Sequence, residues 1–441
     1  MSYELIAALM FSTMLLMMIT GQRVFGAVGF VAVVFAMLLW GEGGTDMGFS
    51  SIMKLMKWNA LLTLPMFVFM GYVMSESRLA SDLYRMFHVW FGPMPGGLAI
   101  GTILLMVLIS AMNGLSVAGM AIGATIALPE LVRRNYDKLM ISGVIQAGSS
   151  LGILIPPSVV LVLFALIARQ PVSQLWLAGI FPGLLMATLF IAYIAIRSWL
   201  NPALAPPISA EERATISRAE KFALLRAGLL PLLIFAAMMV PFVKGWTSLT
   251  ESSVIGALTT VAAAMLKRRF TRQVFEVATR NTLAITTMFM LIIMAALSFG
   301  AVFDGLGAGR AIRGVFLEDL GLSRWEVLIL MQLSFLLMGM FLDDTAMLVI
   351  VAPVYVMLAK ELEFDLIWYG ILYTITCQIA YLTPPFGYNL LLMRALAPPE
   401  FGLPVIYRSV IPFVLVMLLT LILLMIFPQI ALWLPQTIYA R

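Results

Sequence analysis

The chain has 441 residues, of which 62% are hydrophobic and 11% charged, with a formal net charge of +5. A soluble domain carries about 25% charged residues, so this composition excludes a soluble protein and favours several spanning helices of about 20 apolar residues each. A single cysteine, Cys377, and a single histidine, His88, exclude an internal disulfide and a Cys–His metal or haem site. Basic loops facing anionic lipid account for the positive charge, so we expect a lipid bilayer and no nucleic acid as partner.

The first half of the chain, residues 1–200, is predicted to be entirely helical. Its expected elements are spans at 3–20, 24–40 and 58–75, an amphipathic stretch at 76–97, an apolar hairpin at 98–134, a broken helix at 139–168 and a span at 174–198. The first span lacks a basic leader and a small-residue cleavage site, so we interpret it as a spanning helix and not as a signal peptide. His88, in the amphipathic stretch, is interpreted as a structural residue at the membrane interface.

A polar segment at 201–225 follows, and we interpret it as a linker between two halves of similar design. The second half, 226–441, repeats the order with spans at 226–243, 252–266 and 282–303, an amphipathic stretch at 304–325, a hairpin at 326–359, a broken helix at 366–397 and a span at 403–427. The expected fold is therefore an all-α polytopic membrane protein made of two repeats, each with a re-entrant hairpin and a broken helix.

The two repeats are expected to be inverted, because each crosses the membrane an odd number of times if its hairpin re-enters on one side. Lys and Arg are more frequent in the loops on the linker side, above all at 133–138 and 267–272. By the positive-inside rule the linker is cytoplasmic. Both termini are then periplasmic, in a multi-pass protein of a bacterial or archaeal inner membrane.

Two adjacent prolines interrupt each predicted broken helix: Pro156 and Pro157 in the first, Pro384 and Pro385 in the second. Proline lacks a backbone donor and clashes with the preceding turn, so two in succession unwind a helix. Unwound backbone at membrane depth is tolerated where it lines a protein cavity or holds an ion. Breaks at matching positions of inverted repeats are typical of the substrate and ion site of a secondary transporter.

Small and polar residues near each break predict a cation site. Hydroxyl and carbonyl oxygens are the ligands that hard cations such as Na⁺ prefer. In the first half the expected ligands are Ser110, Asn113, Gly114 and Ser116 of the hairpin, with Gly148, Ser149 and Gly152 before the break. Close helix packing by small residues is the alternative interpretation.

The second half carries two adjacent carboxylates in an apolar hairpin, and ionisable residues at membrane depth are costly and usually functional. The expected cation ligands are Gly339, Asp343, Asp344 and Thr345, with Thr383 and Gly387 beside the second break. Helix capping at a wet hairpin tip is the alternative role of the two aspartates. We expect Asn113, Ser150, Asn389 and Arg394 to lie on the substrate path, although Arg394 at a helix end is also a candidate for snorkelling to the interface.

With these residues in place, the sequence resembles the large membrane subunit of tripartite ATP-independent periplasmic (TRAP) transporters. The motifs that carry the resemblance are LPMFVFMGYVM at 64–74, PGGLAIGT at 95–102, GVIQAGSSLGILIPPS at 143–158, LAGIFPGLL at 177–185, FLDDTAMLVIVAPV at 341–354 and YLTPPFGYNLLL at 381–392. They span nearly the whole chain in the family's order. The chain is thus identified as a DctM-like permease.

The resemblance implies an elevator-type carrier that imports an organic anion, driven by a Na⁺ gradient, with Na⁺ as coupling ion and no cofactor. It implies two protein partners, a small four-helix membrane subunit and a periplasmic binding protein that delivers the substrate. A stand-alone Na⁺/dicarboxylate symporter remains an alternative. An intramembrane enzyme using Asp343 and Asp344 is a more remote one, because no nucleophile–base pair accompanies them. A gated channel is disfavoured because nothing predicts a symmetric pore-lining ring.

Overall fold

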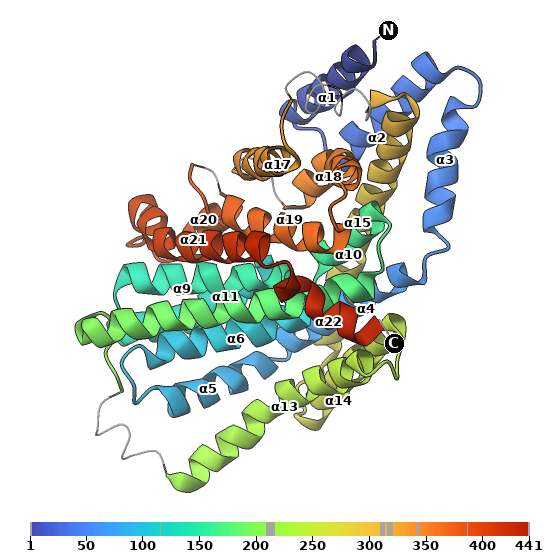
Figure 1. The fold of residues 1–441 in the computed structure, drawn as a ribbon. Helices are drawn as coiled ribbons and strands as arrows, with labels where there is room; N and C mark the ends of the chain where they lie inside the picture. The colour runs from blue at the N-terminus through green and yellow to red at the C-terminus, as the bar shows by residue number, and fades with distance from the viewer. Residues whose placement is uncertain are drawn as a thin grey trace.

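The structure, a computed structural model, describes residues 2–114, 116–208, 217–308, 314, 321–340, 344–385 and 387–439. At some further helical positions, 110–113 and 344–346 among them, only the backbone is described. Within these ranges every regular element is a helix (Figure 1), so the predicted all-α class is confirmed. Five of the described helices, α11, α13, α14, α15 and α21, are long and apolar enough to cross a membrane.

The helices of the first half follow the predicted order. They are α1 (Tyr3–Ile19), α2 (Val24–Phe35), α3 (Gly44–Leu55), α4 (Thr63–Glu76), α5 (Leu79–Phe91), α6 (Gly97–Asn113), α7 (Ser116–Ile122), α8 (Leu128–Arg133), α9 (Lys138–Ser150), α10 (Val159–Ala168) and α11 (Val172–Leu200). The hairpin consists of α6 on one arm and α7 and α8 on the other, and the chain reverses at Gly114.

The second half is built from a similar series. Its helices are α13 (Arg218–Val243), α14 (Leu249–Leu266), α15 (Arg272–Gly305), α17 (Arg324–Gly339), α18 (Asp344–Glu361), α19 (Leu366–Ala380), α20 (Tyr388–Leu396), α21 (Leu403–Ile426) and α22 (Gln429–Tyr439). Half of the amphipathic stretch at 304–325, namely 309–313 and 315–320, and the hairpin tip at 341–343 lie outside the described residues. The inverted relation of the two halves stays a prediction.

Each broken helix begins at an aspartate that caps its first turn. Asp137 accepts hydrogen bonds from the backbone N–H groups of Leu139 and Met140, at 2.9 and 3.1 Å. Asp365 does the same for Ile367 and Trp368, at 2.8 and 3.0 Å. Side-chain oxygens at this position satisfy donors that a helix start leaves unpaired. The two caps therefore fix where α9 and α19 start.

The predicted elements differ from the structure in several places. Helix α13 begins at Arg218, inside the segment interpreted as a linker, because its first turns contain good helix formers such as Lys, Glu, Arg and Ala. Helices α3 and α22 were not predicted as separate elements. The amphipathic stretch at 76–97 forms α5, which buries its apolar face against α6 and α13 within the protein.

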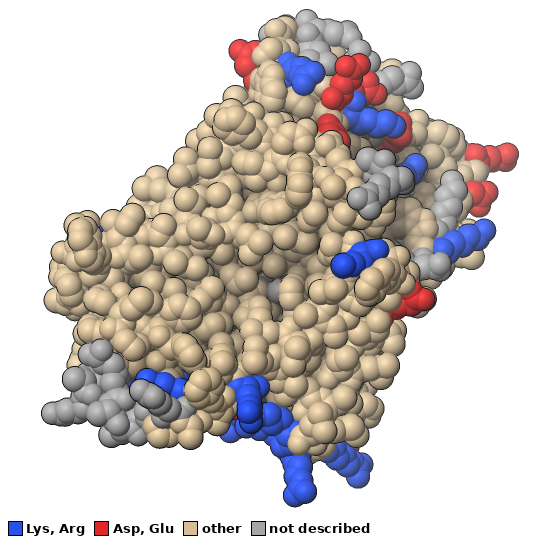
Figure 2. Space-filling model, turned by 60° about the horizontal axis from the view of Figure 1, so that its bottom comes forward, with Lys and Arg blue, Asp and Glu red and all other residues tan. Residues whose placement is uncertain are grey.

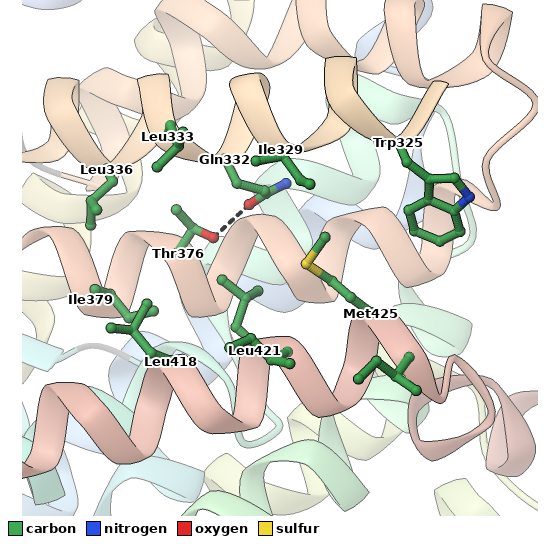
Figure 3. Close-up of a pocket in the computed structure, with 12 residues that line it drawn as sticks. Trp325, Ile329, Gln332, Leu333, Leu336, Thr376, Ile379, Leu418, Leu421 and Met425 are labelled. Carbon is green, nitrogen blue, oxygen red and sulfur yellow. Dashed lines mark hydrogen bonds between the residues drawn. The ribbon is translucent and has the colours of Figure 1, made fainter. Parts of the chain in front are cut away.

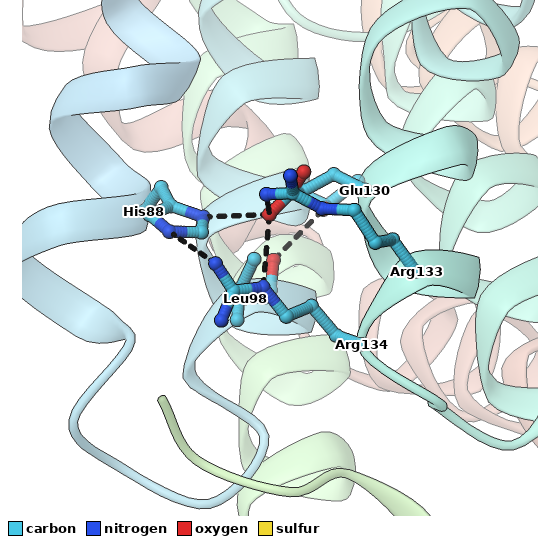
Figure 4. A network of polar contacts seen from close by, with 6 residues as sticks. His88, Leu98, Glu130, Arg133 and Arg134 are labelled. Atoms are coloured by element: carbon cyan, nitrogen blue, oxygen red, sulfur yellow. Dashed lines mark hydrogen bonds and ion pairs between the residues drawn. The ribbon is translucent and has the colours of Figure 1, made fainter. Parts of the chain in front are cut away.

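His88 lies on α5 in a network of charged side chains (Figure 4). Its Nδ1 is 3.6 Å from the Glu130 carboxylate, which also pairs with Arg133 at 2.8 Å and Arg134 at 3.0 Å. This network joins α5 to α8, the end of the first hairpin. His88 therefore takes part in an ion-pair network between α5 and α8, and its place at the membrane interface stays a prediction.

Uncharged side chains cover the broad middle of the face drawn in Figure 2. Lys and Arg project from its lower end, whereas Asp and Glu gather with other basic side chains toward the upper right. An uncharged belt between charged ends is what a bilayer requires, because hydrocarbon cannot solvate charge.

Helices α9 and α21 pack closely because Gly143 has no side chain. A methyl group added there would lie 2.5 Å from the backbone oxygen of Ser409 and 2.5 Å from the Phe413 ring. A Gly26 methyl, on α2, would meet nothing within 4 Å. The first glycine is required by packing, and the second is not.

We expect Gly143→Ala to destabilise the protein by about 1–3 kcal/mol, the usual cost of overpacking. The control Gly26→Ala should be neutral or stabilising by up to about 1 kcal/mol, since Ala favours a helix over Gly. The measurement is the apparent melting temperature of each purified variant. Equal melting temperatures for the two variants would contradict the proposed contact between α9 and α21.

Candidate functional site

The first break separates α9 from α10 and is held by polar contacts inside the protein. After Ser150 the chain makes a short 3₁₀ turn, and α10 restarts at Val159. Ser158 accepts a hydrogen bond from the N–H of Leu161 at 3.2 Å and donates its own to the carbonyl of Ile153. Trp176 of α11 donates to the Ser158 carbonyl at 3.3 Å. The carbonyls of Ile153 and Ser158 in the unwound segment thus find partners within the protein.

The tip of the first hairpin inserts against this break. Gly114 has a φ of +64°, and its carbonyl accepts a hydrogen bond from the N–H of Val159 at 3.2 Å. A Cβ at this position would lie 2.4 Å from the Pro157 carbonyl oxygen. Both the left-handed conformation and the close approach require glycine here. Ser116, at the start of α7, is buried beside the tip.

The second break separates α19 from α20. Thr383 donates to the Ile379 carbonyl at 2.6 Å, and the N–H of Asn389 donates across the break to the carbonyl of Tyr381 at 3.2 Å. Tyr407 of α21 donates its hydroxyl to the Pro385 carbonyl at 2.7 Å. The Pro-Pro peptide bond is cis in both breaks.

The two breaks meet at Asn389, which comes from the second half and contacts the first. Its side-chain amide donates to the Ser116 hydroxyl at 3.0 Å and to the Ser149 hydroxyl at 3.4 Å. All three side chains are buried. Asn389, which we expected on the substrate path, is thus hydrogen-bonded to Ser116 and Ser149, which we expected at the first cation site.

A second contact fastens the broken helices together at the carbonyl of Ser150. This oxygen, at the end of α9, accepts hydrogen bonds from Gln378 at 2.8 Å and from the Tyr381 hydroxyl at 3.3 Å. Sequence reasoning did not include Gln378 or Tyr381 in the site. The available signal was a lone glutamine, Gln378, in an otherwise apolar helix, where an amide needs a partner.

The other predicted site residues have the following places. The side chains of Ser110, Asn113, Asp344 and Thr345, and the whole of Asp343, lie outside the described residues. Gly148 and Gly339 are in close helix contacts, since an added Cβ would lie 2.7 Å from Met106 and 2.4 Å from Ala380. Gly152 lies in the 3₁₀ turn, and Gly387 precedes α20. The Ser150 hydroxyl donates to Ala147 in its own helix.

Arg394 lies near the end of α20 that is remote from Asn389. It is exposed and donates to the carbonyl of Phe401 at 3.4 Å. The described contacts of this side chain therefore involve the surface end of the helix and not the breaks.

Helix ends dominate the electrostatics between the two breaks. No charged residue occurs between Lys138 and Arg169 or between Asp365 and Arg394. Helices α9 and α19 end here with partly negative carbonyls, and α10 and α20 begin here with partly positive N–H groups. Within the part of the chain that the structure describes, no cluster of His, Cys, Asp or Glu could hold a transition metal. The arrangement suits a hard monovalent cation beside an anion.

Comparison with known proteins gives a consistent picture. The family model described as "Tripartite ATP-independent periplasmic transporter, DctM component" matches residues 11–430. The C4-dicarboxylate TRAP transporter large permease protein DctM of Pseudomonas aeruginosa is 30% identical over 378 residues, which cover 85% of this chain and 86% of that protein. The ectoine/5-hydroxyectoine TRAP transporter large permease protein UehC of Ruegeria pomeroyi is 26% identical over 440 residues, 99% of this chain and 100% of the relative.

A solved structure supports the fold alone. The YdaH transporter of Alcanivorax borkumensis superposes with a TM-score of 0.63 at 18% identity, covering 90% of each chain. The family match and the apolar helices together indicate a multi-pass inner membrane protein. The resemblance found in the sequence is confirmed: this chain belongs to the family of DctM components, the large permease subunits of TRAP transporters.

Proposed function

We propose that this chain carries an organic acid across the inner membrane, driven by a Na⁺ gradient. The observation that supports this most is the meeting of two broken helices in an uncharged interior, where Asn389 joins Ser116 and Ser149. Carbonyl ends of α9 and α19 favour the cation, and the N-terminal ends of α10 and α20 favour the carboxylate. Cation and anion thereby partly neutralise each other between two breaks whose own segments, 139–168 and 366–393, contain no charged residue.

The substrate class and the partners follow from the family. The names of the two relatives specify a C4-dicarboxylate and ectoine, and we infer a small organic acid or zwitterion for this chain. A periplasmic binding protein would deliver the substrate, and a small four-helix membrane subunit would complete the transporter. Broken helices and hairpins would move together as an elevator past the remaining helices.

We place the linker in the cytoplasm and both termini in the periplasm. The arrangement of the helices is in keeping with this topology, because both termini lie toward the right of Figure 1 whereas α13 begins at its lower left. The loop at 267–272, which ends α14, contributes basic residues on the linker side. The positive-inside rule assigns that side to the cytoplasm.

The first expected outcome concerns the coupling ion. With the chain, its small membrane subunit and loaded binding protein reconstituted in liposomes, uptake should require an inward Na⁺ gradient and fall to background when K⁺ or choline replaces Na⁺. The measurement is the initial rate of accumulation of labelled substrate. Equal uptake in K⁺ would overturn Na⁺ coupling, and uptake by this chain alone would favour a stand-alone symporter.

The second expected outcome concerns the Asn389 side chain. Asn389→Ala removes the amide that positions the hydroxyls of Ser116 and Ser149, and each lost hydrogen bond is worth about 0.5–1.5 kcal/mol. We therefore expect the half-saturating Na⁺ concentration to rise roughly three- to tenfold. The matched control is Asn281→Ala on α15, which should behave like the parent. A lower melting temperature with unchanged Na⁺ dependence would show that Asn389 has a structural role only.

The third expected outcome concerns the two aspartates of the second hairpin. If either carboxylate serves a cation site, Asp343→Asn or Asp344→Asn should weaken the Na⁺ dependence of uptake while the protein still inserts and purifies. Conversely, parental Na⁺ dependence in both variants would assign the aspartates to helix capping.

A further inference from the structure

A groove on the second half of the molecule, outside the site described above, has a volume of about 690 Å³. It lies between α17, α19 and α21 (Figure 3). Most of its lining is aliphatic, Ile329, Leu333, Leu336 and Ile422 among it, with Trp325 at one end and Gln332 and Thr376 in the middle. An apolar space of this size is not stably filled by water.

The rim of the groove faces the surroundings of the protein. Ile329, Leu333 and Ile422 remain 46, 50 and 50% exposed. In a chain that spans the membrane, exposed aliphatic side chains of this kind face hydrocarbon. Acyl chains are therefore the material next to the open side of the groove.

Gln332 places one unpaired hydrogen-bond donor in the groove. The side chain is 6% exposed, and its carbonyl oxygen accepts the Thr376 hydroxyl. The nitrogen Nε2 has no partner among the described residues, and in Figure 3 it points along the groove toward the Trp325 end. A buried donor without a partner costs about 1–3 kcal/mol. An occupant with an oxygen acceptor at this depth would recover that cost.

The length and the ends of the groove match one leaflet of a bilayer. From Trp325 to Leu336 helix α17 rises about 16 Å, and half of a hydrocarbon core is about 15 Å. Trp325 packs edge-on against Phe364 and Trp368, with ring centroids 5.4 and 6.2 Å apart, and the Arg324 guanidinium lies 4.8 Å from the Phe364 ring. Aromatic and basic residues of this kind mark the membrane–water interface.

Helical side chains lean toward the N-terminus of their helix, so the Gln332 amide lies closer to Trp325 than its Cα does. Gln332 follows Trp325 by seven residues, about 10 Å along the helix, so an ester that pairs with its amide lies inside the groove, below the level of the surrounding headgroups. We propose that the groove binds a glycerophospholipid of the surrounding leaflet. One acyl chain fills the aliphatic part, its ester carbonyl accepts a hydrogen bond from Gln332, and the phosphate end lies toward Trp325 and Arg324.

The test measures lipid binding to the full-length chain, purified in detergent, by native mass spectrometry. The probes are palmitoyl-oleoyl phosphatidylethanolamine and its ether-linked analogue, which has the same chains and headgroup but no ester carbonyl. The parent should bind the ester lipid roughly three- to tenfold more tightly, the value of one hydrogen bond. This comparison needs no variant, so a folding defect cannot produce the result.

Three variants locate the site. Gln332→Met should abolish the preference for the ester lipid, and Leu336→Trp should fill the groove and reduce binding of both lipids. Leu337→Trp is the matched control, because Leu337 is 61% exposed and does not line the groove. It should bind as the parent does.

Equal affinity of the parent for ester and ether lipids would overturn the proposal. So would parental lipid binding by Leu336→Trp. Because binding is read directly, the result does not depend on whether the chain transports a substrate.

Discussion

Unwound backbone inside a membrane must find its hydrogen-bond partners in the protein, and this constraint organises the centre of the molecule. Each Pro-Pro break releases carbonyl and N–H groups where no water is available to pair with them. Gly114 of the hairpin tip accepts the N–H of Val159, and Tyr407 of α21 donates to the Pro385 carbonyl. The hairpin and α21 thus lie where they can pair with the backbone groups that the breaks leave without a helical partner. A substitution at a break therefore alters hydrogen bonds to elements that are distant in the sequence.

The same constraint explains why no charged residue occurs between Lys138 and Arg169 or between Asp365 and Arg394. A fixed charge at this depth is costly unless it is paired. Helix ends supply partial charges of both signs at little cost, because their unpaired groups are part of the backbone. Under the proposed function, such a site would bind a cation or an anion alone weakly and the pair better. This is the physical basis on which coupling of the two can rest.

The helices could be predicted largely from the sequence, since long apolar runs, two proline pairs and the capping Asp137 and Asp365 define them locally. The start of α13 could not, because a helix continues past the membrane as long as its residues favour helix, and hydropathy does not record this. In the site, Ser116, Ser149 and Asn389 were named individually, but nothing local showed that Asn389 reaches across to the other two. Such contacts depend on how the halves pack. Gln378 was missed for the same reason.

The kinds of contact around the breaks also constrain how the site can move. Ser150 is held by Gln378 and Tyr381 through buried hydrogen bonds, and separating them would leave unpaired groups in an apolar interior. The contact of α15 with α18 is of another kind, because Gly300 faces the ring of Pro353 there. Small apolar surfaces can slide past one another without exposing a polar group. If the chain moves as proposed, the two broken helices would stay together, and displacement would occur along apolar surfaces such as that between α15 and α18.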